Sequence, residues 1–519
     1  MSCKLLCALL LPGAFLFAQS ITSSLIGTVH DNTGAVVPNA TVAAIELATN
    51  ARSETRTDAN GDYVLLQLKP GSYTVEISAS GFKKYVRSGV VLELQQQARL
   101  DASLEIGQLS EAVTVTADAS ALETTISTVG DVVNNRAILN LPLNTRNIYS
   151  LIYLTPGVAG GIGNDYNSLS YSVNGARGSS METMVDGATG GFPTVNGYFG
   201  IGVFPSVDAI GEFKMMDSNY SAEFGRSLGN VVNVIYKSGT NSFHGSAYEF
   251  LRNSALDANS FFSNARGVAL PSFKRHQFGG VINGPVIKDK TFFLFSLEDL
   301  RQNAFQSVTT TVPTLLQRRG DFSQTFAANG QQIRIFDPFT TRPNPAGGYI
   351  RDAFAGNVIP LDRINPVSAN LVKYFPLPNT AGNPVTNANN FYNTGGHIND
   401  IDSWDVRIDH NLTSTQRIFG RYSNRFSNDV PASLFPADIR IAEGVINQKN
   451  YMRNAVVDYT NTLSPSTILS ARLGFARALY LYINGGLGFN VSSLGLPKEL
   501  DTAGYLPMFP MVSTAATSR

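Results

Sequence analysis

One stretch of the sequence has the residue spacing of a catalytic motif. Gly225-Arg226-Ser227-Leu228-Gly229 matches the G-x-S-x-G elbow of hydrolases, in which the serine hydroxyl attacks an ester or amide carbonyl. That elbow requires a strand before the serine and a helix after it. Residues 230–236, with the sequence NVVNVIY, are instead typical of a β-strand. The sequence therefore predicts no catalytic residue and a protein that is not an enzyme.

The residue types that bind metals or carry thiol chemistry are scattered. No two of the five histidines have the spacing of metal ligands: His30, His244, His276, His397 and His410. Both cysteines, Cys3 and Cys7, lie in an apolar N-terminal leader. The sequence contains no Gly-Lys-Ser/Thr loop that would cradle a phosphate. We therefore expect no metal site and no cofactor, and any energy that the protein uses must come from a partner.

Polar residues at tight turns between Tyr171 and Asn241 remain as candidates for binding. Asn-Gly, Asp-Gly and Ser-Gly pairs split this stretch into short β-rich pieces, which predicts strands joined by tight turns. The candidates are Asn174, Gly175, Arg177, Asp186, Gly187, Glu223 and Gly225. Asp186 can contact a ligand, but an aspartate before a glycine more often bonds its own turn backbone, and we favour that interpretation.

Four fragments of this stretch, three of which hold these candidates, resemble the plug of TonB-dependent outer-membrane receptors, in the Oar-like branch. They occur in this order: Asn174-Gly175-Ala176-Arg177, Val185-Asp186-Gly187, Ala222-Glu223-Phe224-Gly225 and Lys237-Ser238-Gly239-Thr240-Asn241. The resemblance implies a mainly β fold with an N-terminal β-sandwich, an α+β plug over residues 124–241 and an antiparallel transmembrane β-barrel. Arg177 and Glu223 are open to the same interpretations as Asp186, or they hold the plug against charges of the barrel wall. Within the plug, apolar spacing predicts a helix over 146–154 that Pro156 ends.

A short β-prone run precedes the plug at residues 109–117. It includes Glu111, Ala112, Val113, Thr114, Val115, Thr116 and Ala117. In composition and position this run resembles a TonB box, which implies capture by a TonB-type periplasmic energy-coupling protein through strand addition. The alternative is that the run is only the last strand of the preceding sandwich.

The N-terminal part divides into a leader and a small β-domain. Lys4, an apolar stretch and Ala18 have the pattern of a signal peptide over residues 1–18. Residues 22–105 contain strand-like runs separated by Gly and Asn turns, which predicts a β-sandwich. The runs are 25–29, 40–47, 63–68, 73–77, 90–94 and 98–104. Motifs such as Pro70-Gly71-Ser72-Tyr73 resemble the carboxypeptidase regulatory-like domain, for which we expect a spacer or binding role without hydrolysis.

Residues 242–519 show longer strands with alternating polarity. Apolar Trp404 and Ile408 alternate with charged Asp405, Arg407 and Asp409. A soluble sandwich can alternate in this way, but long strands with short turns on one side and a long loop, predicted at 301–400, favour an outer-membrane barrel. We count about eight to ten strands after Ser242 against the roughly 22 of plugged transporters, so we expect the barrel to be incomplete in this chain.

The charge composition limits the classes of molecule that this protein is expected to bind. The chain has 39 basic and 39 acidic residues without a basic cluster, so no nucleic-acid partner is expected. The resemblance implies an outer-membrane receptor, in contact with lipid, that imports an unknown extracellular solute, with the N-terminal domain in the periplasm. Two alternatives stay open: a non-transporting adhesin or structural surface protein on the same fold, and a secreted soluble protein that binds carbohydrate.

Overall fold

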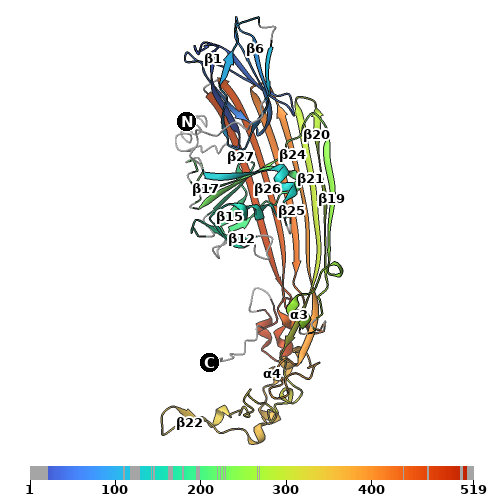
Figure 1. The fold of residues 1–519 in the computed structure, drawn as a ribbon. Coiled ribbons are helices and arrows are strands. Elements are labelled where there is room, and N and C mark those ends of the chain that lie inside the picture. The colour runs from blue at the N-terminus through green and yellow to red at the C-terminus, as the bar shows by residue number, and fades with distance from the viewer. Residues whose placement is uncertain are drawn as a thin grey trace, which may run out of the picture.

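Three parts of the chain are arranged around one long sheet (Figure 1). The computed structural model describes residues 21–510 except 109–111, 117–128, 142, 144–145, 162–167, 178–180, 194–198, 219, 222–223, 226, 228, 266, 268, 437, 465–466 and 503–506. An N-terminal sandwich lies at one end of the sheet and an inner domain lies against one face. The longest connections extend from the opposite end (Figure 1).

The N-terminal sandwich consists of two sheets around one apolar core. Its strands are β1 (Ser23–Asp31), β2 (Thr41–Glu46), β3 (Arg52–Arg56), β4 (Asp62–Leu68), β5 (Gly71–Ser78), β6 (Lys84–Leu92), β7 (Gln97–Arg99), β8 (Ala102–Leu104) and β9 (Ala112–Thr116). One sheet has the order β4-β1-β7 with β8 also on β1, and the other has the order β3-β2-β5-β6-β9. Alternate residues such as Leu25, Val29, Val75 and Ile77 are fully buried, because successive side chains of a strand point to opposite faces.

Two features of the sandwich differ from the sequence-based expectation. Strand β3 is not predicted by apolar alternation, because its residues, Arg52–Arg56, are RSETR. It is an edge strand that pairs only with β2, and edge strands tolerate polar side chains on both faces. Strand β6 covers Lys84–Leu92, whereas the sequence predicts 90–94.

The inner domain covers residues 129–236 and contains two small sheets. Its elements are β10 (Val129–Asn134), α2 (Asn135–Asn140), the 3-10 helix η1 (Ile148–Leu154), β11 (Val158–Gly161), β12 (Ser168–Val173), β13 (Met181–Val185), β14 (Ala188–Thr189), β15 (Gly191–Pro193), β16 (Phe199–Ile201), η2 (Val207–Ala209), β17 (Ile210–Ser218) and β18 (Asn230–Tyr236). The sheets have the orders β10-β17-β18-β13-β14 and β11-β12-β16-β15. Strand β18 occupies the residues whose strand pattern argued against a hydrolase elbow.

The helix expected over 146–154 is shorter and tighter than predicted. It is a 3-10 helix that starts after Asn147, whose side-chain oxygen accepts a hydrogen bond from the Tyr149 amide at 3.0 Å. Ile148, Leu151 and Ile152 are buried as the apolar spacing predicts. They belong to one core with Val281 and Leu294 of the long sheet, so the inner domain and the sheet share a hydrophobic contact.

The long sheet has seven antiparallel strands in sequence order. They are β19 (His244–Asn253), β20 (Phe273–Ile287), β21 (Thr291–Thr310), β24 (Phe391–Asn411), β25 (Gln416–Val430), β26 (Ile446–Ser464) and β27 (Thr467–Asn484). Strands β19 and β27 are the two edges, so the sheet is open and the barrel is not closed. The mainly β fold expected from the sequence, with an unclosed barrel, is confirmed.

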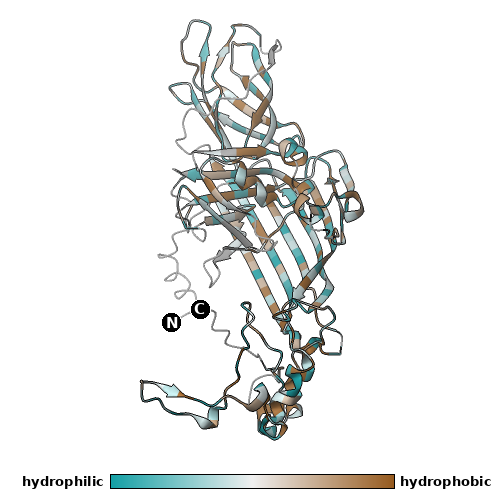
Figure 2. Cartoon of the chain, turned by 60° about the horizontal axis from the view of Figure 1, so that its bottom comes forward, coloured by the Kyte–Doolittle hydropathy of each residue, from teal (hydrophilic) through white to brown (hydrophobic). Residues whose placement is uncertain are grey.

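The polarity of this sheet is the reverse of that in a water-soluble sheet. In β24, Asp405, Arg407 and Asp409 are only 4%, 5% and 3% exposed. Trp404 and Ile408, which alternate with them, are 36% and 50% exposed. Figure 2 shows this alternation of apolar and polar residues along the strands. An apolar outer face and a polar inner face suit a wall that meets lipid on its outer side.

The connections at the two ends of the sheet differ in length. Short turns at 288–290 and 412–415 lie at the end that carries the sandwich, and long connections leave the other end (Figure 1). The long connections contain η3 (Ser254–Leu256), α3 (Phe261–Ala265), η4 (Gln317–Arg319), η5 (Pro338–Thr340), β22 (Arg342–Pro343), β23 (Tyr349–Ile350), η6 (Ala355–Asn357), η7 (Leu361–Arg363), α4 (Pro366–Leu371), η8 (Val372–Tyr374) and η9 (Arg440–Glu443), and η10 (Val491–Leu494) and η11 (Lys498–Asp501) follow β27.

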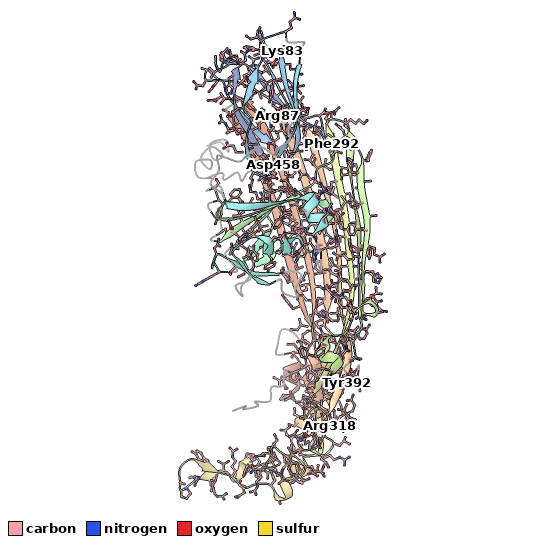
Figure 3. The ribbon with its side chains drawn as sticks, viewed as in Figure 1. Lys83, Arg87, Phe292, Arg318, Tyr392 and Asp458 are labelled. Carbon is pink, nitrogen blue, oxygen red and sulfur yellow. The ribbon has the colours of Figure 1, made fainter. Side chains whose placement is uncertain are left out.

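The longest connection is shorter than the predicted loop 301–400. Residues 301–310 and 391–400 are paired with each other as the ends of β21 and β24, so the connection is 311–390. Those strand ends are rich in Asn, Gln, Thr and Gly, which the sequence does not distinguish from loop. Arg318 organises part of the connection by donating to the carbonyl oxygens of Val372 and Phe375 at 2.7 and 2.9 Å (Figure 3).

Two kinds of feature are not found in the described part of the chain. None of its helices is long and apolar enough to cross a membrane. Nor do three or more His, Cys, Asp or Glu side chains gather anywhere in it as they would around a metal ion.

Candidate functional site

The inner domain meets the long sheet through the turn between β13 and β14. Asp186 and Gly187 form this turn with positive φ angles of 50° and 73°, the backbone of a two-residue hairpin that Asp-Gly favours. The Asp186 side chain is 0% exposed. Its Oδ1 atom accepts a hydrogen bond from the Tyr236 amide at 3.1 Å, and the rest of the carboxylate faces the sheet. The turn is as predicted, but the interpretation that the carboxylate bonds its own turn backbone is wrong.

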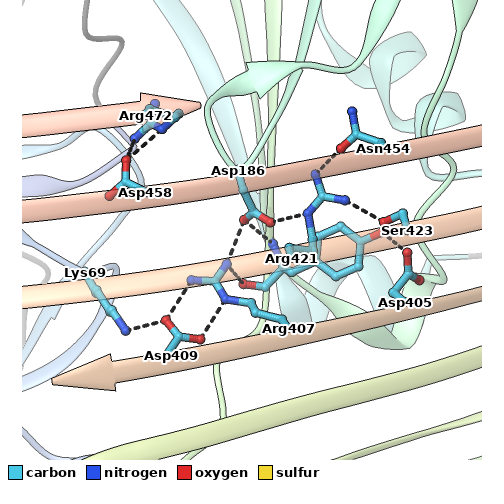
Figure 4. A network of polar contacts seen from close by, with 11 residues as sticks. Lys69, Asp186, Asp405, Arg407, Asp409, Arg421, Ser423, Asn454, Asp458 and Arg472 are labelled. Atoms are coloured by element: carbon cyan, nitrogen blue, oxygen red, sulfur yellow. Dashed lines mark hydrogen bonds and ion pairs between the residues drawn. The ribbon is translucent and has the colours of Figure 1, made fainter. Parts of the chain in front are cut away.

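Two arginines of the sheet bind this carboxylate (Figure 4). Arg407 of β24 donates from Nη1 to Asp186 Oδ1 at 2.8 Å, and Arg421 of β25 donates from Nε to Asp186 Oδ2 at 2.7 Å. Arg421 also donates to Asn454 Oδ1 at 2.6 Å and lies over the Tyr236 ring, 4.9 Å from its centroid. One carboxylate of the inner domain is therefore shared between two neighbouring strands of the sheet.

The same chain of charges continues into the N-terminal sandwich (Figure 4). Arg407 binds both oxygens of Asp409, at 2.8 and 3.0 Å. Asp409 Oδ1 also accepts a hydrogen bond from Lys69 Nζ of the sandwich at 2.8 Å. Lys69, Asp409, Arg407, Asp186 and Arg421 thus form one continuous ion network, which we call the central network. It joins all three parts of the chain.

Two further contacts support the central network from either side. Tyr236 at the end of β18 donates its hydroxyl hydrogen to Asp405 Oδ1 at 2.7 Å. Arg472 of β27 pairs with Asp458 at 2.8 Å and donates to the Gly187 carbonyl at 3.2 Å. The Asp186-Gly187 turn is therefore held by strands β24, β25 and β27 together.

The central network fixes position rather than adding much net stability. Each buried charge loses its hydration, and this cost largely offsets the attraction within a buried ion pair. Removing a single partner, however, leaves a buried charge without compensation, which is strongly destabilising. A cavity of about 180 Å³ adjoins the network, lined by Thr55 and Gln67 of the sandwich, by Asp186, and by Arg407 and Asp458 of the sheet. Apolar side chains such as Leu65 and Phe419 complete the lining, so the walls of the cavity are mixed.

A second contact joins the sandwich directly to the inner domain. Glu212 of β17 accepts a hydrogen bond from the Leu94 amide at 2.6 Å, and Lys214 of the same strand donates to the Leu94 carbonyl at 3.0 Å. Leu94 is fully buried. Burial raises the pKa of Glu212 to about 7, and nearby Glu93 adds to the rise. This contact therefore contains a carboxyl group that titrates near neutral pH.

The other predicted plug residues lie away from the central network. Asn174 and Gly175 form a similar exposed turn after β12, with φ angles of 50° and 79°, and Arg177 is exposed beside it. Gly225 is exposed next to the buried Phe224. Glu223 lies outside the described residues. Of the six candidates that the structure describes, it brings only Asp186 and Gly187 to the contact between the parts.

The run that resembles a TonB box forms a strand on the sandwich. Residues Ala112–Thr116 are β9, which pairs in parallel with β6, and Lys84 lies opposite Ala112. This arrangement is the alternative that the sequence left open, a last strand of the sandwich. Glu111 and Ala117 lie outside the described residues, as does the leader over residues 1–18.

Sequence reasoning did not single out Lys69, Arg407, Asp409 or Arg421 as site residues. A signal for two of them was present, because Arg407 and Asp409 lie on the charged side of a strand with alternating polarity, and the inner face of an outer-membrane barrel is its polar face. The sequence contains no comparable signal for Lys69, which looks like an ordinary turn lysine before Pro70.

Comparison with known protein families gives two matches. Residues 235–518 match the family model described as outer membrane beta barrel domain, and residues 24–105 match the carboxypeptidase regulatory-like domain. The TonB-dependent transporter Oar of Myxococcus xanthus is 31% identical over 299 residues, which cover 55% of this chain and 27% of that relative. The chain thus spans about a quarter of the length of this relative.

Solved structures show weaker likenesses. The outer membrane transporter YddB of Escherichia coli is similar with a TM-score of 0.42 and 13% identity, over 68% of this chain and 40% of that one. A mutant of the ferric enterobactin receptor of Pseudomonas aeruginosa is similar with a TM-score of 0.37 and 12% identity, over 67% of this chain and 40% of that one.

Proposed function

Because this chain belongs to the family of outer-membrane β-barrel proteins, we propose that it is a TonB-dependent receptor that binds an extracellular solute and imports it into the periplasm. The chain lies in the outer membrane, and its relatives are transporters and receptors rather than enzymes. A secreted soluble protein is therefore excluded. The substrate, the direction of transport and the energy source belong to the proposal.

One observation carries the proposal. The inner domain contacts the polar face of a sheet whose other face is apolar, and it does so through the buried ion pairs of Asp186 with Arg407 and Arg421. A domain that occupies the polar side of a membrane wall blocks the passage there, which is the position of a plug. Ion pairs and hydrogen bonds can be exchanged for water as such a plug moves, and the apolar contact with Val281 and Leu294 would have to open as well.

The connection lengths give the proposed orientation. Outer-membrane barrels have short periplasmic turns and longer extracellular loops. By this rule the N-terminal sandwich, which contacts the short-turn end through Lys69 and Asp409, faces the periplasm. The long connection 311–390 then faces the outside and is the proposed site of first contact with solute.

Energy transfer is proposed to act through residues 111–117. A TonB-type protein would capture this run by adding a strand, with backbone hydrogen bonds supplying affinity. The following 11 residues, 118–128, lead to β10 (Val129–Asn134), an edge strand of the inner domain. A pull on the run would therefore reach the inner domain at an edge, where a strand can separate from a single neighbour.

Two substitutions at one position test this coupling in the full-length receptor. Val113→Pro removes a backbone donor and fixes φ, so it should abolish strand addition, whereas Val113→Thr should be tolerated. Uptake in energised cells is measured against a panel of labelled ferric chelates, oligosaccharides and peptides, with equilibrium binding measured in isolated outer membranes. Binding should survive in both variants, and uptake should be lost only in the proline variant.

The outcomes separate the competing functions. Normal uptake by the Val113→Pro variant at equal surface abundance would place the coupling site elsewhere. Wild-type protein that reaches the surface but imports no member of the panel, with or without a functional TonB system, would favour an adhesin or structural surface protein.

A further inference from the structure

Strand β9 occupies an edge of the sandwich that would otherwise be open. It pairs with β6 in parallel over five positions, from Lys84 opposite Ala112 to Ser88 opposite Thr116. In the sheet order β3-β2-β5-β6-β9 it is the terminal strand. The backbone edge of β6 over residues 84–88 is therefore a docking surface for an extended segment, and its occupant belongs to the same chain.

The occupant is the run proposed above for energy coupling. We propose that the edge of β6 holds residues 112–116 in the resting receptor and keeps them from a periplasmic partner, and we call this edge the dock. Strand β9 must then separate from β6 before the partner can pull on the inner domain. This inference rests on the proposed function, because it assigns a regulatory step to the same segment. It makes the N-terminal sandwich a control element for coupling rather than a passive spacer.

The attachments of the sandwich explain why separation must occur. While β9 stays on β6, a pull on β9 is borne by the sandwich instead of by β10. The sandwich is fixed to the sheet by Lys69 with Asp409, and Arg417 donates to Ser53 Oγ at 2.8 Å. It is also fixed to the inner domain through Leu94. A pull on docked β9 is therefore divided among the contacts of the sandwich, including the one at Leu94, and it reaches β10 only after β9 has detached or after all of these contacts have failed together.

Of these two routes, detachment of β9 is the easier. A five-residue edge strand in parallel pairing has one neighbour, and parallel pairs are slightly less stable per residue than antiparallel ones. The opposing contacts include charged groups that are nearly fully buried, such as Asp409, and the fully buried Leu94. A strand can also separate one residue at a time, whereas the sandwich must leave as a whole.

The register of the two strands allows a reversible disulfide cross-link between β6 and β9, which we call the staple. Val86 lies opposite Thr114 and is partly exposed, next to the buried Tyr85. Directly paired positions on neighbouring strands fall within the distance range of a disulfide. The sequence has no cysteine after Cys7, so the double variant Val86→Cys with Thr114→Cys has no competing thiol between residues 8 and 519. The matched control combines Val86→Cys with Val115→Cys, because position 115 points to the opposite face of the strand.

The first measurement tests the dock itself. Under mild oxidation of the full-length receptor in detergent, the 86/114 double variant should cross-link nearly completely, as mapped by mass spectrometry. The 86/115 variant should cross-link at least tenfold more slowly. Equal rates in the two variants would overturn the dock, because they would mean that residues 112–116 are not held in this register.

The second measurement tests its regulatory role. The probe is the purified periplasmic domain of the TonB-type protein from the same cell, captured by the immobilised receptor. We expect the oxidised staple to weaken capture at least tenfold, reductant to restore it, and each single cysteine variant to behave as wild type. Equal capture by oxidised and reduced receptor would overturn the inference alone, because the partner would then add to the free edge of β9. No capture by wild-type receptor would overturn the coupling function and this inference together.

Discussion

The carboxylate of Asp186 lies 2.7 Å from Nε of Arg421, and both side chains are fully buried although 235 residues separate them in the sequence. Asp186 belongs to a tight turn of the inner domain, and Arg421 belongs to the inner face of the long sheet. Their contact brings a turn of the inner domain to one place on the wall, with Arg407 on the second carboxylate oxygen. Charge at this place should therefore control how firmly the inner domain is held.

The variant Asp186→Asn keeps the shape of the side chain and removes its charge. Arg407 retains Asp409, but Arg421 loses its carboxylate partner, so we expect a loss of about 3–5 kcal/mol in the free energy that holds the inner domain in place. The measurement is amide hydrogen exchange of β18 in detergent-solubilised protein. Asp352→Asn is the control, because its pair with Arg342 is exposed and its loss should leave β18 unchanged. Unchanged protection in the Asp186→Asn protein would show that shape, and not charge, holds the turn.

Gly187 and Gly175 offer a matched pair for separating backbone strain from crowding. Both follow a residue at φ 50° in a tight turn. A Cβ atom at Gly175 would have no atom within 4 Å, whereas at Gly187 it would lie 2.0 Å from Arg472 Nη1. Gly175→Ala should cost about 1–2 kcal/mol from the left-handed backbone alone. Gly187→Ala should cost more, because it also displaces Arg472 from the turn. Thermal unfolding of the two variants gives the comparison, and equal melting temperatures would contradict it.

Lys69 is predicted to hold the sandwich to the sheet. Its side chain is 24% exposed and its partner Asp409 is 4% exposed, so Lys69→Met should weaken docking by about 1.5–3 kcal/mol, the range for hydrogen bonds to charged groups. Hydrogen exchange at residues 67–72 should rise. Lys83→Met is the control, since Lys83 lies at the far tip of the sandwich and its partner Glu105, 3.4 Å away, is 57% exposed (Figure 3). A similar rise in both variants would mean that the substitutions act within the sandwich itself.

Glu212 should make the contact between sandwich and inner domain depend on pH. Its pKa is about 7 in the folded protein against 4.5 for the free side chain, because burial disfavours the carboxylate. The folded state therefore binds the proton more tightly, and the stabilisation is full below pH 4.5, declines as pH rises to about 7 and is constant above that. Glu212→Gln should remove this dependence. The measurement is exchange of the Leu94 amide from pH 5 to 8, corrected for intrinsic rates, and an equal slope in both proteins would assign the effect to another group.

Local pattern explains most of what the sequence predicted about the fold. Turns at Asp186-Gly187 and Asn174-Gly175 follow from the tolerance of these residue pairs for positive φ. Strand β18 follows from its run of β-branched residues. The apolar outer face and polar inner face of the long sheet follow from the alternation around Trp404. The polar strand β3 and the polar ends of β21 and β24 were missed, because pairing with a neighbouring strand forms them and their side chains carry no apolar signal.

The sequence by itself determined that this chain is mainly β, with a sandwich, turn-rich middle part and alternating wall strands, because each of these depends on residues a few positions apart. Only the tertiary structure decided which charges meet. Lys69, Asp186, Asp409 and Arg421 come from three parts of the chain, and their contacts exist only once the sheet, the inner domain and the sandwich are assembled. The pairing of β9 with β6 was decided in the same way, since a short β-prone run is compatible with either a free segment or an edge strand until a neighbouring strand supplies its hydrogen bonds.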